Sequence, residues 1–185
     1  MNDFRFELTD EEKTYLRELV AQSIRFRFNP SDGPFGPPEP PTAKLKEHLG
    51  AFVTLKIGGS LRGCIGNVQG SGELFRTVWN MARSAAFEDP RFPPLTEGEF
   101  HAVEYEISIL SPLAPCPDPE QVEVGRHGLI MSRDGRSGLL LPQVPVEWGW
   151  DRETFLAQTC VKAGLPQNAW KDRETTILWF EAVVF

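Results

Sequence analysis

Hydrophobic residues recur at helical spacing in three stretches of the chain. The first begins near Thr9, where Thr9 and Glu12 fit a capping box. It must end before the Asn-Pro pair at 29–30, because proline cannot continue a helix. The second stretch runs from about 73 to 87, and the third begins at Asp151, whose side chain can cap a helix. Each stretch has one apolar face, so the sequence predicts three helices packed on a core.

Apolar runs and alternating patterns predict the strands. Runs of this kind, bounded by glycine, proline or charged residues, occur at 51–57, 61–68, 102–110, 127–133, 139–142 and 175–185. The glycine-containing segments 58–60 and 134–138 predict the turns of two hairpins. Helices combined with hairpin-linked strands are typical of an α+β fold with a mainly antiparallel sheet, and this is the fold class that we predict.

Residues 29–41, with the sequence NPSDGPFGPPEPP, are rich in proline. Such a segment is stiff and extended, and it contributes little to a core. Two interpretations are open: a surface connection between elements, or a ligand for the aromatic groove of a partner. Residues 42–49 predict a short helix, and residues 111–121 predict a loop. No shift in composition marks a domain boundary, so we expect a single domain over 1–185.

Composition and charge exclude several classes of protein. A length of 185 residues with 41% hydrophobic residues is ordinary for one globular domain. The net charge of −7 argues against a general nucleic-acid or membrane-surface binder. No apolar run reaches the length of a transmembrane helix, and the N-terminal residues do not resemble a signal peptide. We therefore expect a cytoplasmic protein, and the sequence indicates neither a cofactor nor a metal site.

The three cysteines, Cys64, Cys116 and Cys160, lie far apart in the sequence. Their spacing fits neither a zinc knuckle nor a redox pair, and their odd number argues against a secreted disulfide framework. Cys160 falls on the apolar face of the third helix, so we expect it in the core. Cys116 stands between two prolines, and we expect it to be an exposed loop thiol.

The most unusual stretch is LRGCIGN at 61–67. In a regular strand Arg62 and Cys64 point to the same face, and a guanidinium beside a thiol favours the thiolate. Gly63 and Gly66 let another backbone or a ligand approach closely. In one interpretation Cys64 is a nucleophile in an anion-binding pocket. In the other it is a buried strand cysteine beside glycines that serve a bulge.

Two further residues are candidates for acid–base chemistry. His127 stands between glycines at the start of a predicted strand, where a substrate can approach a general base closely. Glu106 lies on the polar face of the strand 102–110, where it either faces solvent or takes part in catalysis. With Cys64 these residues would form a set of nucleophile, base and orienting carboxylate. The sequence alone does not place the three together.

Two short motifs are candidates for binding. Asp89 and Arg91 fall in the sequence DPRF, which predicts a tight turn whose carboxylate caps the local backbone or pairs with the arginine. Arg91 is alternatively free to bind an anionic ligand. Trp148 and Trp150 flank a glycine, so they either line a pocket or partner surface or pack under the third helix.

The hexapeptide LRGCIG at 61–66 resembles the signature of the AMMECR family, which is called AmmeMemoRadiSam system protein A in bacteria and archaea. Other stretches that match the family follow in its order: GAFVTLK at 50–56, DPRFPPL at 89–95, EISIL at 106–110, GRHGLIM at 125–131, LLLPQV at 139–144 and FLAQTCVKAGL at 155–165. The segment 29–41 lies where family members vary, which supports its interpretation as a connection.

The resemblance implies an α+β fold of two subdomains around a cleft, with the signature near the cleft. It also implies two partners, a Memo-type protein and a radical S-adenosylmethionine enzyme. It implies no settled activity. The positions that match the family's motifs are Arg62, Cys64, Asp89, Arg91, Glu106 and His127.

Our leading hypothesis is an enzyme or enzyme component that acts on a small anionic molecule. The residues expected to act are Cys64 as nucleophile or thiol carrier, His127 as the base, Glu106 as the group that orients it, and Arg62 and Arg91 as anion-binding residues. Structural roles are expected for Gly63, Gly66 and Asp89. The alternative is a non-catalytic interaction module in which 61–66 is a structural strand and Trp148 or Trp150 contacts partners.

Overall fold

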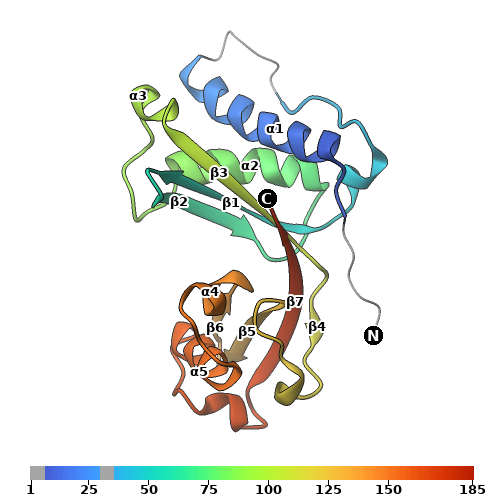
Figure 1. Cartoon of the computed structure of the whole chain (residues 1–185), viewed down its shortest axis with the longest axis vertical. Coiled ribbons are helices and arrows are strands. Elements are labelled where there is room, and N and C mark those ends of the chain that lie inside the picture. The colour runs from blue at the N-terminus through green and yellow to red at the C-terminus, as the bar shows by residue number, and fades with distance from the viewer. Residues whose placement is uncertain (1–6, 30–35) are drawn as a thin grey trace. The chain divides into compact units, whose positions relative to one another are not determined.

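The computed structural model describes residues 7–29 and 36–185, which fold into two compact units (Figure 1). The first unit runs to Leu110 and takes in Val183–Phe185, and the second comprises Ser111–Ala182. A single domain over 1–185 and a cleft within it stay predictions. Residues 30–35 lie outside the described part of the chain, so both interpretations of the proline-rich segment stay predictions as well.

The first unit contains most of the elements that the sequence predicts. Its elements are α1 (Asp10–Phe28), the 3₁₀ turn η1 (Ala43–Lys46), β1 (Gly50–Ile57), β2 (Ser60–Asn67), α2 (Leu74–Phe87), α3 (Glu97–Phe100) and β3 (Val103–Leu110). The capping box of Thr9 and Glu12 is present at the start of α1, which confirms that prediction. The short helix predicted over 42–49 is shorter and of the 3₁₀ type.

The sheet of the first unit is antiparallel, in the order β2-β1-β3. A two-residue turn joins β1 to β2, and its Gly58 and Gly59 have φ angles of 56° and 77°. Two successive left-handed residues define the hairpin turn that glycine favours, so the predicted hairpin is confirmed. Beyond β3, the chain end adds to this sheet, since Phe185 exchanges two backbone hydrogen bonds with Ile107 at 2.9 and 3.1 Å.

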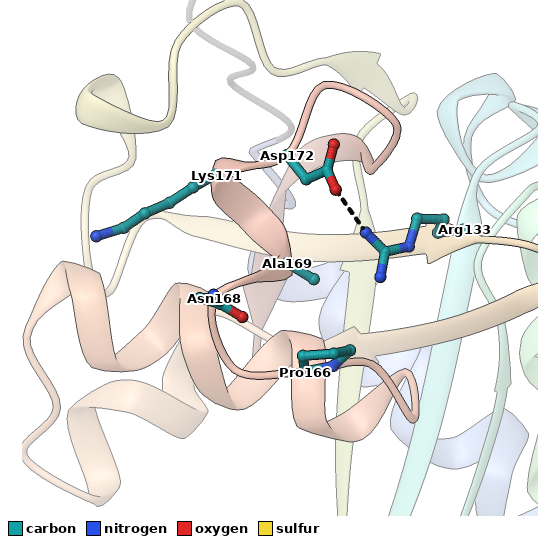
Figure 2. Close-up of a pocket in the computed structure, with 6 residues that line it drawn as sticks. All are labelled: Arg133, Pro166, Asn168, Ala169, Lys171 and Asp172. Carbon is teal, nitrogen blue, oxygen red and sulfur yellow. Dashed lines mark hydrogen bonds and ion pairs between the residues drawn. The ribbon is translucent and has the colours of Figure 1, made fainter.

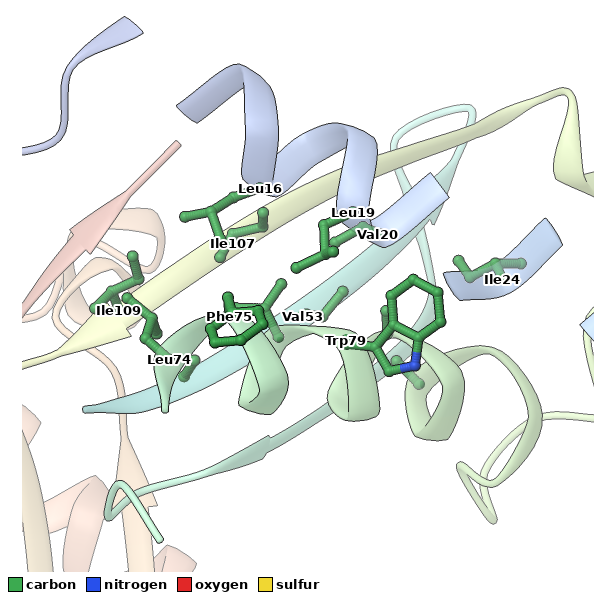
Figure 3. Close-up of a cluster of buried hydrophobic side chains, with 14 of the residues drawn as sticks. Leu16, Leu19, Val20, Ile24, Val53, Leu74, Phe75, Trp79, Ile107 and Ile109 are labelled. Atoms are coloured by element: carbon green, nitrogen blue, oxygen red, sulfur yellow. The ribbon is translucent and has the colours of Figure 1, made fainter. Parts of the chain in front are cut away.

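Helices α1 and α2 cover one face of this sheet. Figure 3 shows their side chains meeting those of β1 and β3 in one cluster, which includes Leu16, Leu19, Val20, Ile24, Val53, Leu74, Phe75, Trp79, Ile107 and Ile109. The hydroxyl of Ser23 donates a hydrogen bond to the carbonyl of Trp79 at 2.7 Å, so a buried polar group also ties the two helices together. The opposite face of the sheet carries the polar side chains of the candidate site.

The second unit contains smaller elements. They are β4 (Ala114–Pro115), the 3₁₀ turns η2 (Pro119–Gln121) and η3 (Ala169–Lys171), β5 (His127–Arg133), β6 (Arg136–Leu140), α4 (Gln143–Glu147), α5 (Arg152–Lys162) and β7 (Thr176–Val184), whose last residues belong to the first unit. Strand β5 pairs antiparallel with both β6 and β7, and β4 adds to β7. Antiparallel pairing with helices in both units confirms the α+β class.

Three details of the second unit differ from the sequence prediction. The segment 111–121, expected as a loop, contains β4 and η2. The hairpin turn expected over 134–138 contains only Asp134 and Gly135, with φ angles of 54° and 74°. Helix α4 was not predicted, because it is short and carries an internal proline.

Helix α5 begins and ends as its sequence predicts. Asp151 accepts a hydrogen bond from the N–H of Thr154 at 2.8 Å, and Gly164 follows the helix with a φ of 70°. Cys160 on this helix is fully buried in the hydrophobic core of the second unit, which confirms its expected place. In the described part of the chain, no helix is long and apolar enough to cross a membrane.

Candidate functional site

The stretch 61–67 forms β2, and this strand contains a β-bulge. Lys56 pairs with Leu61, but the preceding residue of β1, Leu55, pairs with Gly63, so Arg62 has no partner on β1. The extra residue ends the regular alternation of side chains between the two faces. The regular alternation expected to place Arg62 and Cys64 on one face is therefore interrupted between these two residues.

Arg62 binds a carboxylate and not the thiol. Its Nε and Nη2 donate to the two carboxylate oxygens of Glu99 at 3.0 and 3.2 Å, and Nη2 also lies 3.4 Å from the carbonyl of Pro94. Glu99 is the N3 residue of α3 and forms a capping box with Thr96. The pair with Arg62, together with bonds from Thr96, lowers the pKa of Glu99 to about 2. Arg62 therefore fastens α3 to β2.

The two glycines of β2 allow close packing. A Cβ atom at Gly63 would lie 2.1 Å from the carbonyl oxygen of Ala85 on α2. A Cβ atom at Gly66 would lie 2.2 Å from the ring of Phe52 on β1. Both distances are far inside van der Waals contact, so only glycine fits at either position. In this structure the space is filled by the protein itself.

The thiol of Cys64 lies on the sheet face that the helices do not cover. It is half-buried, and its Sγ accepts a hydrogen bond from the hydroxyl of Thr54 at 3.2 Å. Thr54 pairs with Cys64 on one side and with Glu106 on the other, so the three side chains share this face. Glu106 makes an ion pair with Lys56 at 3.3 Å. The structure thus brings Cys64 and Glu106 to one face, on either side of Thr54.

The backbone of Cys64 is held by the turn that contains Asp89. The Asp89 carboxylate, almost completely buried, accepts a hydrogen bond from the N–H of Cys64 at 2.9 Å. The same carboxylate binds the guanidinium of Arg91 through two contacts, at 2.9 and 2.7 Å. Arg91 in turn donates to the carbonyl of Cys64 at 3.1 Å. Asp89 and Arg91 thus bind the N–H and the C=O of the same residue.

These contacts fix the charges of the pair. The guanidinium of Arg91, followed by backbone N–H donors, holds the pKa of Asp89 well below its usual range despite its burial. Asp89, in turn, raises the pKa of Arg91, and the nearby Cys64 contributes in the same direction. The Arg91 side chain is 53% exposed, so it combines a fixed position with access to solvent. A fixed, accessible guanidinium next to a thiol is suited to binding an anion.

The aromatic ring of Phe92 lies close to both arginines. The guanidinium carbon of Arg91 is 5.5 Å from the ring centroid of Phe92, and that of Arg62 is 6.0 Å from it. Both distances fit cation–π contacts. Such contacts hold each guanidinium over the ring and leave its positive charge unneutralised.

His127 belongs to the second unit, where its imidazole is engaged locally. It is buried, and its Nδ1 accepts a hydrogen bond from the N–H of Glu123 at 3.0 Å. The ring packs on Trp179 at 4.4 Å between centroids. Burial, and then the charge of Arg126, lower the pKa of His127. A neutral imidazole that accepts at Nδ1 carries its proton on Nε2, so this geometry does not favour a general base, and that role stays a prediction.

Two cavities open on the second unit, and neither includes a residue of the signature. One, of about 280 Å³, is shown in Figure 2, where Arg133 points toward Asp172 and forms an ion pair at 3.0 Å. The other, of about 570 Å³, includes Cys116 and Trp170. Cys116 is half-buried and not an exposed thiol as expected, and burial raises its pKa. Among the described residues, no cluster of His, Cys, Asp and Glu is arranged to hold a metal ion.

Comparison with known proteins decides the family. The AMMECR1 family model matches residues 17–185. A protein of Thermococcus onnurineus is 41% identical, with 97% of this chain and 92% of that protein covered. A protein of Aquifex aeolicus is 42% identical, with 92% and 91% covered. The chain belongs to the AMMECR1 family.

The AMMECR1 fold extends over nearly the whole chain. The crystal structure of the uncharacterized protein PH0010 from Pyrococcus horikoshii superposes with a TM-score of 0.88 at 39% identity. The alignment covers 97% of this chain and 93% of that one. The likeness to this solved structure establishes the fold.

Sequence reasoning missed two residues that shape this AMMECR1 site, Thr54 and Glu99. A regular hairpin with the observed two-residue turn would pair Thr54 with Gly63, and only the bulge brings it opposite Cys64. Glu99 caps α3 locally, but its bond to Arg62 joins segments 37 residues apart. Neither contact has a local sequence signal.

Proposed function

We propose that this AMMECR1-family protein is a cysteine-dependent enzyme, or a component of one, that acts on a small anionic molecule. The observation that carries the proposal is the surroundings of Cys64: a hydroxyl donor at its Sγ and a fixed guanidinium at its carbonyl. The thiolate is the nucleophilic form of cysteine, and the Thr54 hydroxyl donates to the sulfur atom that would carry its charge. The guanidinium of Arg91 supplies the positive charge that a substrate anion needs.

Each residue then has a defined role. Sγ of Cys64 forms a bond to an electrophilic carbon of the substrate while the leaving group departs with its electron pair. Arg91 binds the anionic group, and Asp89 keeps Arg91 in place. We assign Arg62 no part in the chemistry in this proposal, because its Nε and Nη2 bind Glu99. The roles predicted for His127 and Glu106 stay predictions, and this proposal requires neither.

We also propose that the protein works with a Memo-type protein and a radical S-adenosylmethionine enzyme, as the family resemblance implies. A half-buried thiol that has no base bonded to it among the described residues suits a carrier or a step completed by a partner. Nucleic acid is not proposed as a partner, because the chain has a net charge of −7.

Alkylation of the native protein tests the nucleophile. We expect anionic iodoacetate to modify Cys64 before Cys116 or Cys160 at neutral pH, read by mass spectrometry of each cysteine. Burial raises the pKa of both other thiols, so they serve as internal controls. If Cys116 reacts while Cys64 stays unmodified, the nucleophile is excluded.

Two arginine variants test the anion site. In Arg91→Gln we expect the preference for iodoacetate over neutral iodoacetamide to fall, because the positive charge at the thiol is lost. Arg62→Gln removes the same charge from a residue bound to Glu99, so it should leave the preference unchanged. Equal effects of both variants would mean that the preference follows net charge and not a site.

A second function is favoured by the packing of β2. The backbone of α2 fills the space at Gly63, as it would in a non-catalytic interaction module with a structural signature strand. Cys64→Ser separates the two functions. An enzyme keeps its fold and loses turnover when assayed with its partner proteins, whereas a module keeps both its fold and its pathway activity.

A further inference from the structure

A large aromatic residue of the second unit lies open to solvent. Trp148 is 70% exposed, and Val146 on α4 is 58% exposed. Trp148 stacks on Trp150, with ring centroids 6.1 Å apart and 20° between the ring planes. Single exposed aliphatic residues are common, but an exposed tryptophan joined to other exposed apolar groups indicates an interaction surface.

The two tryptophans are held by the surrounding backbone. Trp148 caps the end of α4 through backbone hydrogen bonds, and Gly149 turns the chain with a φ of 64°. The N–H of Trp150 donates to the carbonyl of Pro145 at 2.8 Å, and the Trp150 ring packs on the hydrophobic core of the second unit. Trp148 therefore rests on a fixed neighbour, and little conformational entropy is lost when a ligand contacts it.

The apolar surface extends to a neighbouring turn. A Cβ atom at Gly125 would lie 3.2 Å from Cγ2 of Val146, which places the turn beside α4. Val124 in this turn is also exposed. We define the Trp148 surface as Val124, Val146, Trp148 and Trp150.

The charges around the Trp148 surface are mainly acidic. Glu147 and Asp151 precede and follow the tryptophan pair, and both are exposed. Within the described residues, Glu147 makes no ion pair or side-chain hydrogen bond that would neutralise it. The nearby Arg126 is paired with Glu181 at 2.9 Å, and Arg152 is paired with Glu120. The rim therefore offers negative charge to a partner.

We propose that the Trp148 surface binds a segment of a partner protein that combines aliphatic side chains with lysine or arginine. Aliphatic groups would pack on Val146 and on the tryptophan faces. A cationic side chain would lie over Trp148 and within reach of Glu147, so it would gain a cation–π contact and an ion pair. This surface belongs to the second unit and does not depend on the role of Cys64.

Charge also argues against two other partners for the Trp148 surface, a second copy of the chain and an anionic membrane. A second copy of the chain brings the same acidic rim and a net charge of −7, so self-association is opposed by repulsion. An anionic membrane surface is repelled for the same reason. Only a basic partner gains from both the apolar centre and the acidic rim.

The test selects partners from a random peptide library displayed on phage, with the full chain as bait. The enriched peptides are then synthesised and their Kd measured by calorimetry for four proteins: the wild type, Trp148→Ala, Glu147→Gln and Val161→Ala. Val161 is an exposed valine on α5, outside the surface, and so serves as the matched apolar control. Circular dichroism confirms that each variant is folded.

We expect the enriched peptides to be basic and aliphatic. Trp148→Ala should raise Kd by about 30-fold, the effect of losing a central aromatic contact. Glu147→Gln should raise Kd by about threefold and weaken its dependence on salt, while Val161→Ala should change nothing. Salt dependence is the readout that a merely apolar contact would not give.

Four outcomes overturn the proposal. One is a selection that yields acidic peptides, or peptides that bind Trp148→Ala as tightly as the wild type. Another is a selection that enriches no peptide at all. A wild-type dimer that dissociates in Trp148→Ala, seen by analytical ultracentrifugation, would assign the surface to a second copy. Binding to phosphatidylserine vesicles that is lost in Trp148→Ala would assign it to a membrane.

Discussion

The carboxylate of Asp89 accepts a hydrogen bond from the backbone N–H of Cys64 at 2.9 Å, across 25 residues of sequence. Through this bond, the turn after α2 fixes the middle of the signature strand. The same carboxylate orients Arg91, so one buried group determines both the position of the thiol and the position of the positive charge beside it. Packing and proposed chemistry therefore depend on the same residue.

Asp89→Asn should destabilise the first unit by about 2–3 kcal/mol, because hydrogen bonds to a charged group are lost and Arg91 loses its counter-charge. Hydrogen-exchange mass spectrometry of peptides covering β2 measures this locally, since two compact units need not unfold together. The matched control is Asp134→Asn in the β5–β6 turn, where the side chain is 85% exposed and asparagine accepts the left-handed φ. Similar exchange in both variants would contradict the central role of Asp89.

Acidification should destabilise the first unit through two carboxylates whose pKa values are lowered in the folded state, those of Asp89 and Glu99. The pKa of Asp89 is depressed below its usual range by Arg91, and that of Glu99 is lowered to about 2 by Arg62. A depressed pKa means that the folded state binds fewer protons than the unfolded state, so stability is present above the ordinary carboxyl pKa and is lost as pH falls. Protection of β2 should decline from about pH 5 toward pH 2. Asp89→Asn should flatten this decline, and an unchanged pH profile in that variant would exclude Asp89 as its source.

Much of this fold follows from local signals in the sequence. The capping box at Thr9, the cap at Asp151 and the glycine pair at 58–59 each fix an element end through contacts within a few residues. Such contacts can be predicted because donor and acceptor are neighbours in the chain. Helix α4 has no such local signal, because it has no side-chain cap and is too short for a helical repeat of apolar residues.

The site was less predictable, for a geometric reason. The residue types of the signature indicated a thiol, a guanidinium and close backbone packing, and all three are present. Which guanidinium lies near Cys64 depends on the bulge at Arg62, which regular strand periodicity does not reveal. Arg62 then binds Glu99, and Arg91 takes the place beside the thiol.

Gly63→Ala should destabilise the first unit by about 2–3 kcal/mol, because the new methyl group would overlap the carbonyl of Ala85 and push α2 away from β2. Gly72→Ala is the matched control, since nothing lies within 4 Å of a Cβ atom there and its φ is not left-handed. The control should be neutral or slightly stabilising. Thermal unfolding followed by circular dichroism compares the melting temperatures of the two variants. An equal change in both would show that α2 shifts to accommodate the methyl group at little energetic cost.

Thr54→Val should slow alkylation of Cys64 at neutral pH by about fivefold, the equivalent of one lost hydrogen bond of about 1 kcal/mol. The hydroxyl of Thr54 donates to Sγ at 3.2 Å, so this variant removes a hydrogen bond to the proposed nucleophile. Thr54→Ser keeps the donor and should keep most of the rate, so a loss in both variants would indicate a packing effect. The rate for Cys116 within the same samples corrects for reagent and pH. A rate for Cys64 that is unchanged in Thr54→Val would mean that the hydroxyl does not act on the sulfur, and Arg91 would then be the only described group proposed to activate it.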